Sequence, residues 1–389
     1  MIAPDLADPE FLVSSQPASH GDFGMRLSGG IRGTGEEGQE TDRDQDHLYS
    51  SELPSLLEPP LPATESTSGR QQQYEERQHT SITQPPLPPL PPPAPQPSPD
   101  MSKLTDAVKA LINASHARPG YTRAGAQVKP ALELLASDAQ EKNVGLPAWV
   151  TVSTAVSATM NCPEAMTEIF HLANTRSATS RTPVQNAELI REVGLKCISF
   201  NGIPRSINTL GAFWKSLPEP VSSSLSTTPT RKLTAVNLGR RQAGGRALWD
   251  NVYLGFETKL LDRLAQSHPD LPVHILDGHY SSLLGNPRDA ATAAIRPEPV
   301  GRVLTSLVAV ACLRAQTGVG PQVVSHIFGL RKAYKHGAAD APGELPVEGG
   351  EWLAGDDGNI WLLESIDKLA HAIGGGEGTT FAPGIRPKL

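Results

Sequence analysis

The sequence predicts an all-α protein whose folded part covers residues 101–389. Apolar residues there recur every three or four positions, as they do along one face of an α-helix. Strand-like alternation of apolar and polar residues is nearly absent, and aromatic residues, which strands favour, make up only 5% of the chain. We therefore expect a helical domain and no sheet.

The helical segments are separated by Gly, Pro or Asn, the residues that commonly end or begin helices. A polar loop rich in Ser and Thr is expected near residues 218–232. On either side of that loop, the periodicity predicts helices at residues 103–115, 128–141, 146–160, 163–175, 185–199, 204–215, 245–267, 273–284, 298–315, 320–335 and 360–373.

Residues 1–100 have a different composition from the rest of the chain. They contain 16 Asp or Glu against 5 Arg and no Lys, a net charge of −11, and they show no sustained apolar period. Such a segment cannot bury enough apolar surface to offset the entropy of ordering, so we expect an acidic, Pro-rich, disordered region. Its ten prolines between Pro85 and Pro99 predict polyproline II, either as a stiff linker or as a ligand for an SH3 or WW domain.

Charge and hydropathy exclude two classes of partner. The remaining residues carry 29 basic and 25 acidic side chains, a scattered excess too small for a nucleic-acid surface. The longest apolar run, from Leu304 to Leu313, is about half the length that a bilayer requires, so no membrane span is expected. The N-terminus resembles neither a secretory signal nor an Arg-rich presequence.

The three cysteines, Cys162, Cys197 and Cys312, are too far apart in sequence to form a local redox or zinc-binding pair, and we expect no cofactor. Cys162 precedes a predicted helix, where a helix N-terminus lowers a thiol pKa, so it is the candidate reactive cysteine. The alternative is a buried, inert thiol.

His274, Asp277 and His279 have the residue types of a metal site. On an α-helix, however, residues 274 and 277 are neighbours while residue 279 projects elsewhere. The sequence therefore predicts that no metal is bound there.

An internal repeat is visible at a shift of 158 residues, which aligns residues 163–172 with residues 321–330 at four identities in ten positions. Two tandem helical halves are therefore predicted, at about residues 101–217 and 233–375, followed by a flexible tail at residues 376–389. A duplicated unit can bury internally the face that a single unit buries by dimerising, and a homo-oligomer also remains open.

Two stretches carry a family resemblance. Residues 188–208 contain a helix, a turn at Gly202 and Pro204, and a helix bearing Asn208, while residues 302–333 contain an apolar helix followed by Ser325 and His326. Together with residues 280–284, they resemble the AhpD and carboxymuconolactone decarboxylase superfamily, and most of all a fungal AhpD-like group that includes peroxisomal members. The resemblance implies an AhpD-like helical fold.

The resemblance also bears on chemistry. Redox members place two cysteines before the family histidine, but Val319 and Gln322 occupy those positions when His326 is aligned with it, and Leu307 stands near the family glutamate. Disulfide exchange of the AhpD type is therefore excluded at this site. The decarboxylase branch keeps the histidine alone, which implies proton transfer by His326 without a cofactor.

On this hypothesis the protein is an enzyme acting on a small organic acid, lactone or peroxide-related substrate, with Ser325 and Glu192 beside His326. Glu168 and His171, at the equivalent place in the first repeat, form a second candidate pair or else a surface ion pair. The alternative is a degenerate, non-catalytic fold that binds a ligand or assembles. His326 would then be a packing histidine, and Glu192 part of a solvated charged face.

The chain ends in Pro387, Lys388 and Leu389. This tripeptide is similar to Ser-Lys-Leu, which the peroxisomal import receptor reads at a free C-terminus. A peroxisomal location is therefore expected, with cytoplasm or mitochondrion as alternatives.

Overall fold

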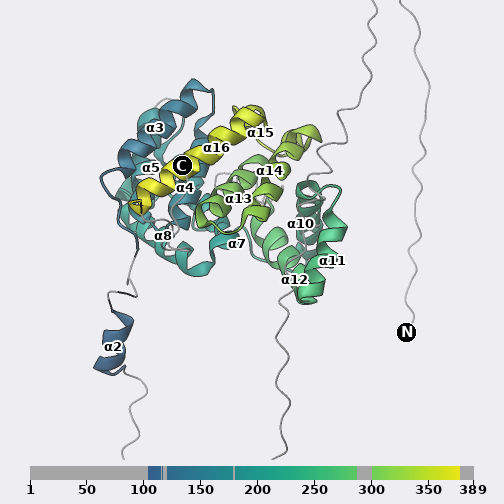
Figure 1. Cartoon of the computed structure of the whole chain (residues 1–389), viewed down its shortest axis with the longest axis horizontal. Coiled ribbons are helices and arrows are strands. Elements are labelled where there is room, and N and C mark those ends of the chain that lie inside the picture. The colour runs from purple at the N-terminus through teal and green to yellow at the C-terminus, as the bar shows by residue number, and fades with distance from the viewer. Residues whose placement is uncertain (1–103, 115, 117–120, 178–179, 287–299, 377–389) are drawn as a thin grey trace, which may run out of the picture. The chain divides into compact units, whose positions relative to one another are not determined.

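A computed structural model describes residues 104–114, 116, 121–177, 180–286 and 300–376 (Figure 1). These residues form helices and contain no strand, which confirms the all-α class. None of their helices is long and apolar enough to cross a membrane. The expectations for residues 1–100, for Pro85 to Pro99 and for residues 377–389, including Pro387, Lys388 and Leu389, lie outside the described residues.

Two helices, α4 (Leu146–Thr159) and α13 (Arg302–Gln316), pack against each other at the centre of the core. α4 is buried continuously from Ala148, and α13 is buried continuously up to Leu313. Small and apolar residues surround nearly the whole circumference of each helix, which is typical of a helix that is covered on all sides.

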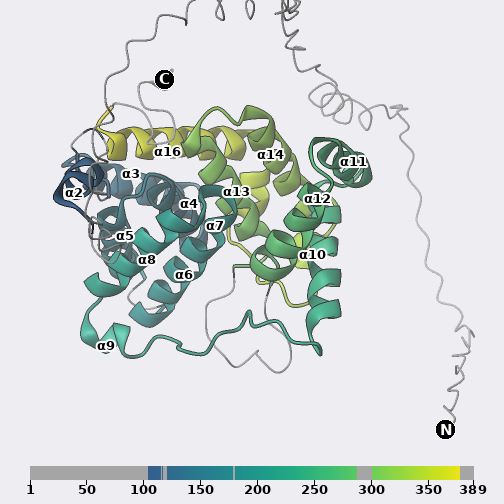
Figure 2. The ribbon, with the colours of Figure 1, turned by 90° about the horizontal axis from the view of Figure 1, so that it is seen from below.

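The other helices pack on this central pair or on its neighbours (Figure 2). On the α4 side are α3 (Val128–Glu141), α5 (Pro163–Arg176), α6 (Pro183–Lys196), α7 (Ile198–Asn201), α8 (Ile203–Ser216) and α9 (Glu219–Ser222). On the α13 side are α10 (Leu238–Val252), α11 (Glu257–Ser267), α12 (Asp270–His274), the π-helix η2 (Ile275–Leu284) and α14 (Gly320–Lys335).

The C-terminal part of the domain joins the two sides. After a 3₁₀ turn, η3 (Ala338–Asp340), come α15 (Gly350–Ala354) and α16 (Asp356–Gly374). α16 packs on α3, α4 and α13, so it covers both central helices.

The 158-residue shift aligns helices with similar surroundings. It places α5 on α14, and each of these follows and packs against one of the two central helices. The two predicted halves therefore have a corresponding helix pair, whereas their common origin stays a prediction.

Two predicted helices were wrong in detail. The predicted helix at residues 245–267 is interrupted between Val252 and Glu257, where Gly255 has φ of +89°, a left-handed conformation that no α-helix contains. The predicted helix at residues 273–284 begins as α12 and continues as a π-helix, whose wider turn the apolar spacing did not reveal.

The contact between α10 and η2 depends on a glycine, and this gives a first prediction. A Cβ added at Gly245 would lie 2.5 Å from the Ser281 Cα, whereas one at Gly244 would meet nothing within 4 Å. Gly245→Ala should lower the free energy of unfolding by about 1–3 kcal/mol through overpacking. Gly244→Ala should raise it by about 0.5–1 kcal/mol through helix propensity. Denaturant unfolding of the two variants measures both; equal effects would contradict the close contact.

Candidate functional site

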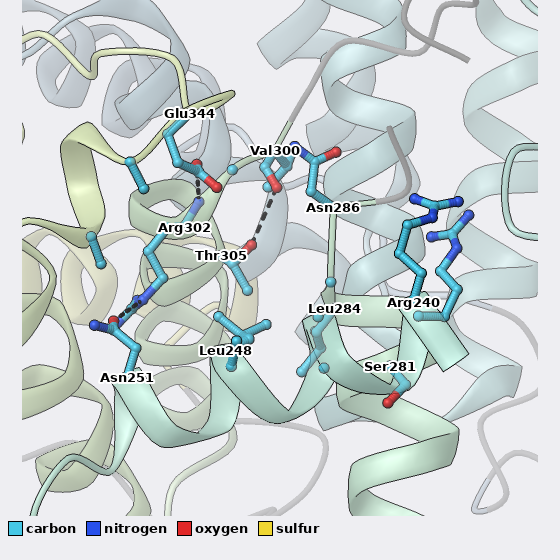
Figure 3. Close-up of a pocket in the computed structure, with 18 residues that line it drawn as sticks. Arg240, Leu248, Asn251, Ser281, Leu284, Asn286, Val300, Arg302, Thr305 and Glu344 are labelled. Carbon is cyan, nitrogen blue, oxygen red and sulfur yellow. Dashed lines mark hydrogen bonds between the residues drawn. The ribbon is translucent and has the colours of Figure 1, made fainter. Parts of the chain in front are cut away.

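Three arginines line an open pocket between α10, η2 and the start of α13, which we call the arginine pocket (Figure 3). Arg240 and Arg241 lie in the first turn of α10, and Arg302 is the first residue of α13. The pocket has a volume of about 330 Å³, and Glu344 is the one acidic side chain among its described lining residues. The lining is therefore cationic and suits an anion of the size of a small organic acid.

Arg302 is buried and held by several partners. Its guanidinium donates to the Asn251 Oδ1 at 2.6 Å, the Ser306 Oγ at 2.5 Å and the Gly329 carbonyl at 2.7 Å. Its backbone N–H donates to the Glu344 carboxylate at 2.6 Å, so that this side chain caps α13. Burial lowers the pKa of Arg302 to about 10, which leaves the group charged at neutral pH.

His326 lies behind the arginine pocket, in a much smaller cavity of about 10 Å³. Leu248, Leu284, Arg302 and Thr305 line both spaces. The Nε2 of His326 lies 3.5 Å from the Tyr253 hydroxyl, which accepts from the Tyr280 hydroxyl at 3.3 Å. The small cavity has room for about one water molecule and not for an organic substrate.

Burial, assisted by the positive charge of Arg302, lowers the pKa of His326 to about 4. The imidazole is therefore neutral at physiological pH. A neutral imidazole can accept a proton, but a group with this pKa is a weak base.

The depressed pKa of His326 predicts a pH dependence of stability. The unfolded chain binds a proton at this histidine below pH 6.5, whereas the folded chain does so only near pH 4. Stability should therefore fall by about 3 kcal/mol as the pH drops from 6.5 to 4. His326→Gln should remove that part of the slope, as measured by urea unfolding at pH 7 and pH 5. An unchanged slope would contradict the burial of a neutral imidazole.

Ser325 directly precedes His326 on α14. Its side chain is buried, and its hydroxyl donates to the Pro321 carbonyl one turn earlier at 2.9 Å. Hydrogen bonds of this kind are common for serines within helices and carry no catalytic meaning by themselves.

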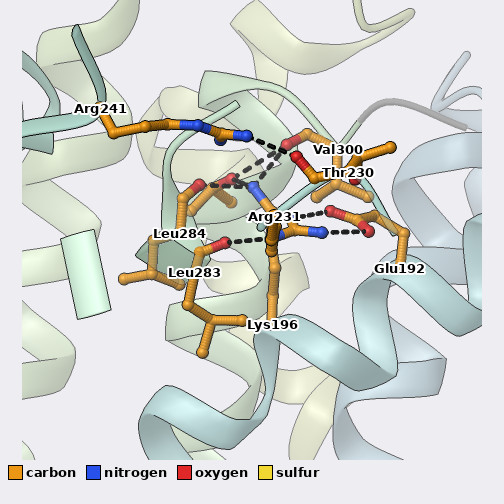
Figure 4. Close-up of polar contacts among 9 residues, drawn as sticks. Glu192, Lys196, Thr230, Arg231, Arg241, Leu283, Leu284 and Val300 are labelled. Carbon is orange, nitrogen blue, oxygen red and sulfur yellow. Dashed lines mark hydrogen bonds and ion pairs between the residues drawn. The ribbon is translucent and has the colours of Figure 1, made fainter. Parts of the chain in front are cut away.

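Glu192 belongs to a different cluster (Figure 4). Its Oε2 accepts from the Arg231 Nη1 at 3.0 Å, and its Oε1 also contacts the Arg231 Nη2. Only 3% of the Glu192 side chain and 15% of the Arg231 side chain are exposed. The predicted solvated charged face was therefore wrong, because Arg231, 39 residues further along the chain, covers the carboxylate.

The same cluster contains Lys196, which the sequence analysis missed (Figure 4). Its ammonium is fully buried and donates to the Leu284 carbonyl at 2.6 Å, the Val300 carbonyl at 2.7 Å and the Thr305 Oγ1 at 2.8 Å. Burial lowers the pKa of Lys196 to about 7, although the Glu192 carboxylate opposes this shift. A lone lysine within an apolar helix pattern gave no signal of these distant partners.

Glu168 and His171 are not brought together. Both residues are described, yet no ion pair joins them; Glu168 is half-buried, while His171 is exposed and lies against the Phe170 ring, with centroids 5.6 Å apart. No hydrogen bond or ion pair therefore joins the second candidate pair, and neither residue lines the arginine pocket or the cavity of His326.

Of the two expectations for Cys162, the structure agrees with the buried thiol and not with a lowered pKa. Cys162 precedes α5 as predicted, but its side chain is fully buried, and burial raises its pKa to about 11. Desolvation of a thiolate outweighs the favourable field of the helix N-terminus here.

Cys197 and Cys312, 115 residues apart, meet in the core with their Sγ atoms 3.5 Å apart. Their hydrogen bond and their burial raise the pKa of Cys197 well above its usual range. Cys197 is therefore a poor nucleophile. Sequence spacing could not reveal the pair, because the contact arises from the packing of α7 and α13.

The prediction that His279 projects away from His274 was also wrong. The π-helix brings residues five apart onto one face, and the two imidazole rings lie 5.3 Å apart. The His279 Nδ1 lies 3.0 Å from the Ser199 Oγ. Among the described residues, no group of three or more His, Cys, Asp or Glu side chains could hold a metal ion.

Comparison of the chain with protein-family models, with curated proteins and with solved structures found no match. The AhpD-like resemblance accordingly stays a prediction.

Proposed function

We propose that this protein binds a small organic anion, such as a carboxylate, in the arginine pocket. The observation that carries the proposal is the lining itself: Arg240, Arg241 and Arg302 surround a space of about 330 Å³ that contains one described carboxylate. Arginine recognises carboxylates through charge and paired N–H groups. The proposal corresponds to the ligand-binding alternative of an AhpD-like fold.

A ligand screen by thermal unfolding and calorimetry tests this function. Small mono- and dicarboxylates should raise the melting temperature, and the matching neutral amides should not. Arg240→Gln should lower the affinity for carboxylates and make that affinity less dependent on salt concentration, because Arg240 is an exposed charge in the lining of the pocket.

Arg263→Gln is a matched control, since Arg263 is an exposed arginine on α11 and does not line the pocket. Equal binding of acids and amides, or equal loss in the two variants, would reject the anion site.

A second candidate is catalysis, and the shared wall of the two cavities favours it. Arg302 and Thr305 border both the arginine pocket and the cavity of His326. The Tyr280 hydroxyl donates to the Tyr253 hydroxyl, which in turn lies 3.5 Å from the His326 Nε2. On this hypothesis His326 transfers a proton to or from an acid or lactone held by the arginines. The inner cavity has room for about one water molecule. The proton would therefore move between His326 and the bound acid or lactone through that water, or directly once the wall between the two cavities has opened.

The two functions are separated by one variant. If the protein is an enzyme, His326→Gln should abolish turnover of an acid or lactone and leave its binding intact. Full turnover by His326→Gln would reject this role, and the absence of turnover in the natural chain would leave the binding function.

The peroxisomal location also stays a proposal, since Pro387, Lys388 and Leu389 lie outside the described residues. Fusing a fluorescent protein to the N-terminus and deleting the three residues tests it. Deletion of the three residues should change the fluorescence from punctate to diffuse, and puncta that persist after the deletion would show that the tripeptide is not the targeting signal.

A further inference from the structure

The short helix α2 (Asp106–Ile112) has an apolar face that contacts no core. Thr105 caps it, its hydroxyl accepting from the Val108 N–H at 3.3 Å, yet none of its residues is buried. Three apolar side chains lie on one face of α2 and are exposed: Val108 (41%), Leu111 (71%) and Ile112 (55%); Leu104 (56%), just before the cap, is exposed as well. A seven-residue helix is marginal in water by itself, so its amphipathic pattern indicates a packing partner.

A second apolar face without a partner among the described residues lies on α8. Its residues Ile203, Ile207 and Trp214 are 60%, 66% and 54% exposed, and the half-buried Leu210 continues the same stripe. The opposite side of α8, with Ser206, Thr209 and Phe213, faces the core.

The α8 stripe borders a groove of about 450 Å³, which we call the α8 groove. Its apolar lining includes Leu195, Leu210, Trp214 and Pro229, and the charged residues Glu188, Arg191, Glu192 and Arg231 also border it. An apolar stripe beside a groove is the kind of surface on which the apolar face of an amphipathic helix docks.

The chain that follows α2 is anchored beside α8. The Thr122 N–H donates to the Asn161 carbonyl at 2.9 Å, and the Thr122 hydroxyl donates to the Met160 carbonyl at 2.8 Å. The side chain of the same Asn161 accepts from the Asn208 Nδ2, on α8, at 3.3 Å.

The segment between α2 and Tyr121 is long enough for α2 to reach α8. Residues 113–120 separate α2 from Tyr121, and an extended tether of this length reaches about 30 Å. The 14 residues of α8 span about 21 Å, so α2 can reach any part of the stripe from its own chain. A short tether also gives a high effective concentration, which favours the chain's own helix over one from solution.

We propose that α2 docks in the α8 groove of the same chain, with Leu104, Val108 and Leu111 packed against Ile207, Leu210 and Trp214. The docked helix closes the α8 groove with a segment from the N-terminal side of the domain. This surface is separate from the arginine pocket, and the proposal does not depend on the function proposed for that pocket.

The fluorescence of Trp214 in the full chain tests the docking. Leu111→Asp places a charge on the apolar face of α2 and should shift the Trp214 emission to the red and increase its quenching by acrylamide. Ala110→Asp, which adds the same charge on the opposite face of α2, should change neither quantity. Both comparisons are repeated in a Trp214→Phe background, where the differences should vanish, and circular dichroism checks that each variant is folded.

A synthetic peptide of residues 101–116 provides a second measurement. It should bind the Leu111→Asp variant, whose groove is vacated, and not the natural chain, whose groove is occupied. Unchanged emission of Leu111→Asp, or equal peptide binding by both proteins, would overturn the proposal. A Trp214 signal that depends on protein concentration, with a dimer in size-exclusion chromatography, would overturn it by assigning the groove to a second copy.

Discussion

Glu192→Ala should lower the free energy of unfolding by about 3–5 kcal/mol. The substitution leaves the Arg231 guanidinium buried opposite no carboxylate, and an uncompensated buried charge is among the most destabilising changes a protein can undergo. Guanidinium unfolding followed by circular dichroism measures the loss.

An exposed ion pair that also contains a glutamate is the control. Glu364 and Lys368 lie one turn apart on α16, with side chains 61% and 57% exposed, and Glu364→Ala should cost only about 0.3–0.5 kcal/mol. In addition, the double variant of Glu192 and Arg231 should lose less than the sum of the two single losses, because neither charge is then left alone. Additive losses would show that the two side chains do not interact.

Arg302→Met should also be strongly destabilising, by about 2–4 kcal/mol, because it orphans the buried acceptors of Asn251, Ser306 and Gly329. The same variant should raise the pKa of His326, since the Arg302 charge helps to hold it down. Thermal unfolding measures the first effect, and an NMR titration of the imidazole measures the second.

Arg302→Lys separates the two effects. Lysine keeps the positive charge, but its single nitrogen cannot replace the three guanidinium nitrogens that reach Asn251, Ser306 and Gly329, so stability should still fall while the pKa of His326 stays low. A His326 pKa that is unchanged in Arg302→Met would show that burial alone sets it.

Local periodicity predicted the fold class well. The repeating apolar positions of α3, α4, α5 and α14 lie where the sequence placed them, because a helix that buries one face must repeat its apolar residues every three or four positions. The same reasoning missed the break at Gly255, since the flanking apolar residues continue the helical spacing across it.

The candidate site was only partly predictable. His326 is buried beside a cavity, as one alternative required, but Arg240, Arg241 and Arg302 were not singled out. Their convergence depends on the packing of η2 and α10 against α13, and no local pattern encodes contacts between residues that are 60 positions apart. The pairing of Cys197 with Cys312 was hidden for the same reason.

The single ammonium of Lys196 has a consequence for how the chain tolerates change. It binds the carbonyls of Leu284 and Val300, so these two oxygens lie within about 5.3 Å of each other, although 15 residues separate them in sequence. One side chain of α6 thus connects the last residue of η2 with a residue just before α13. A change at Lys196 would therefore take this donor from both carbonyls at once, and the end of η2 and the residues before α13 would lose their shared contact together.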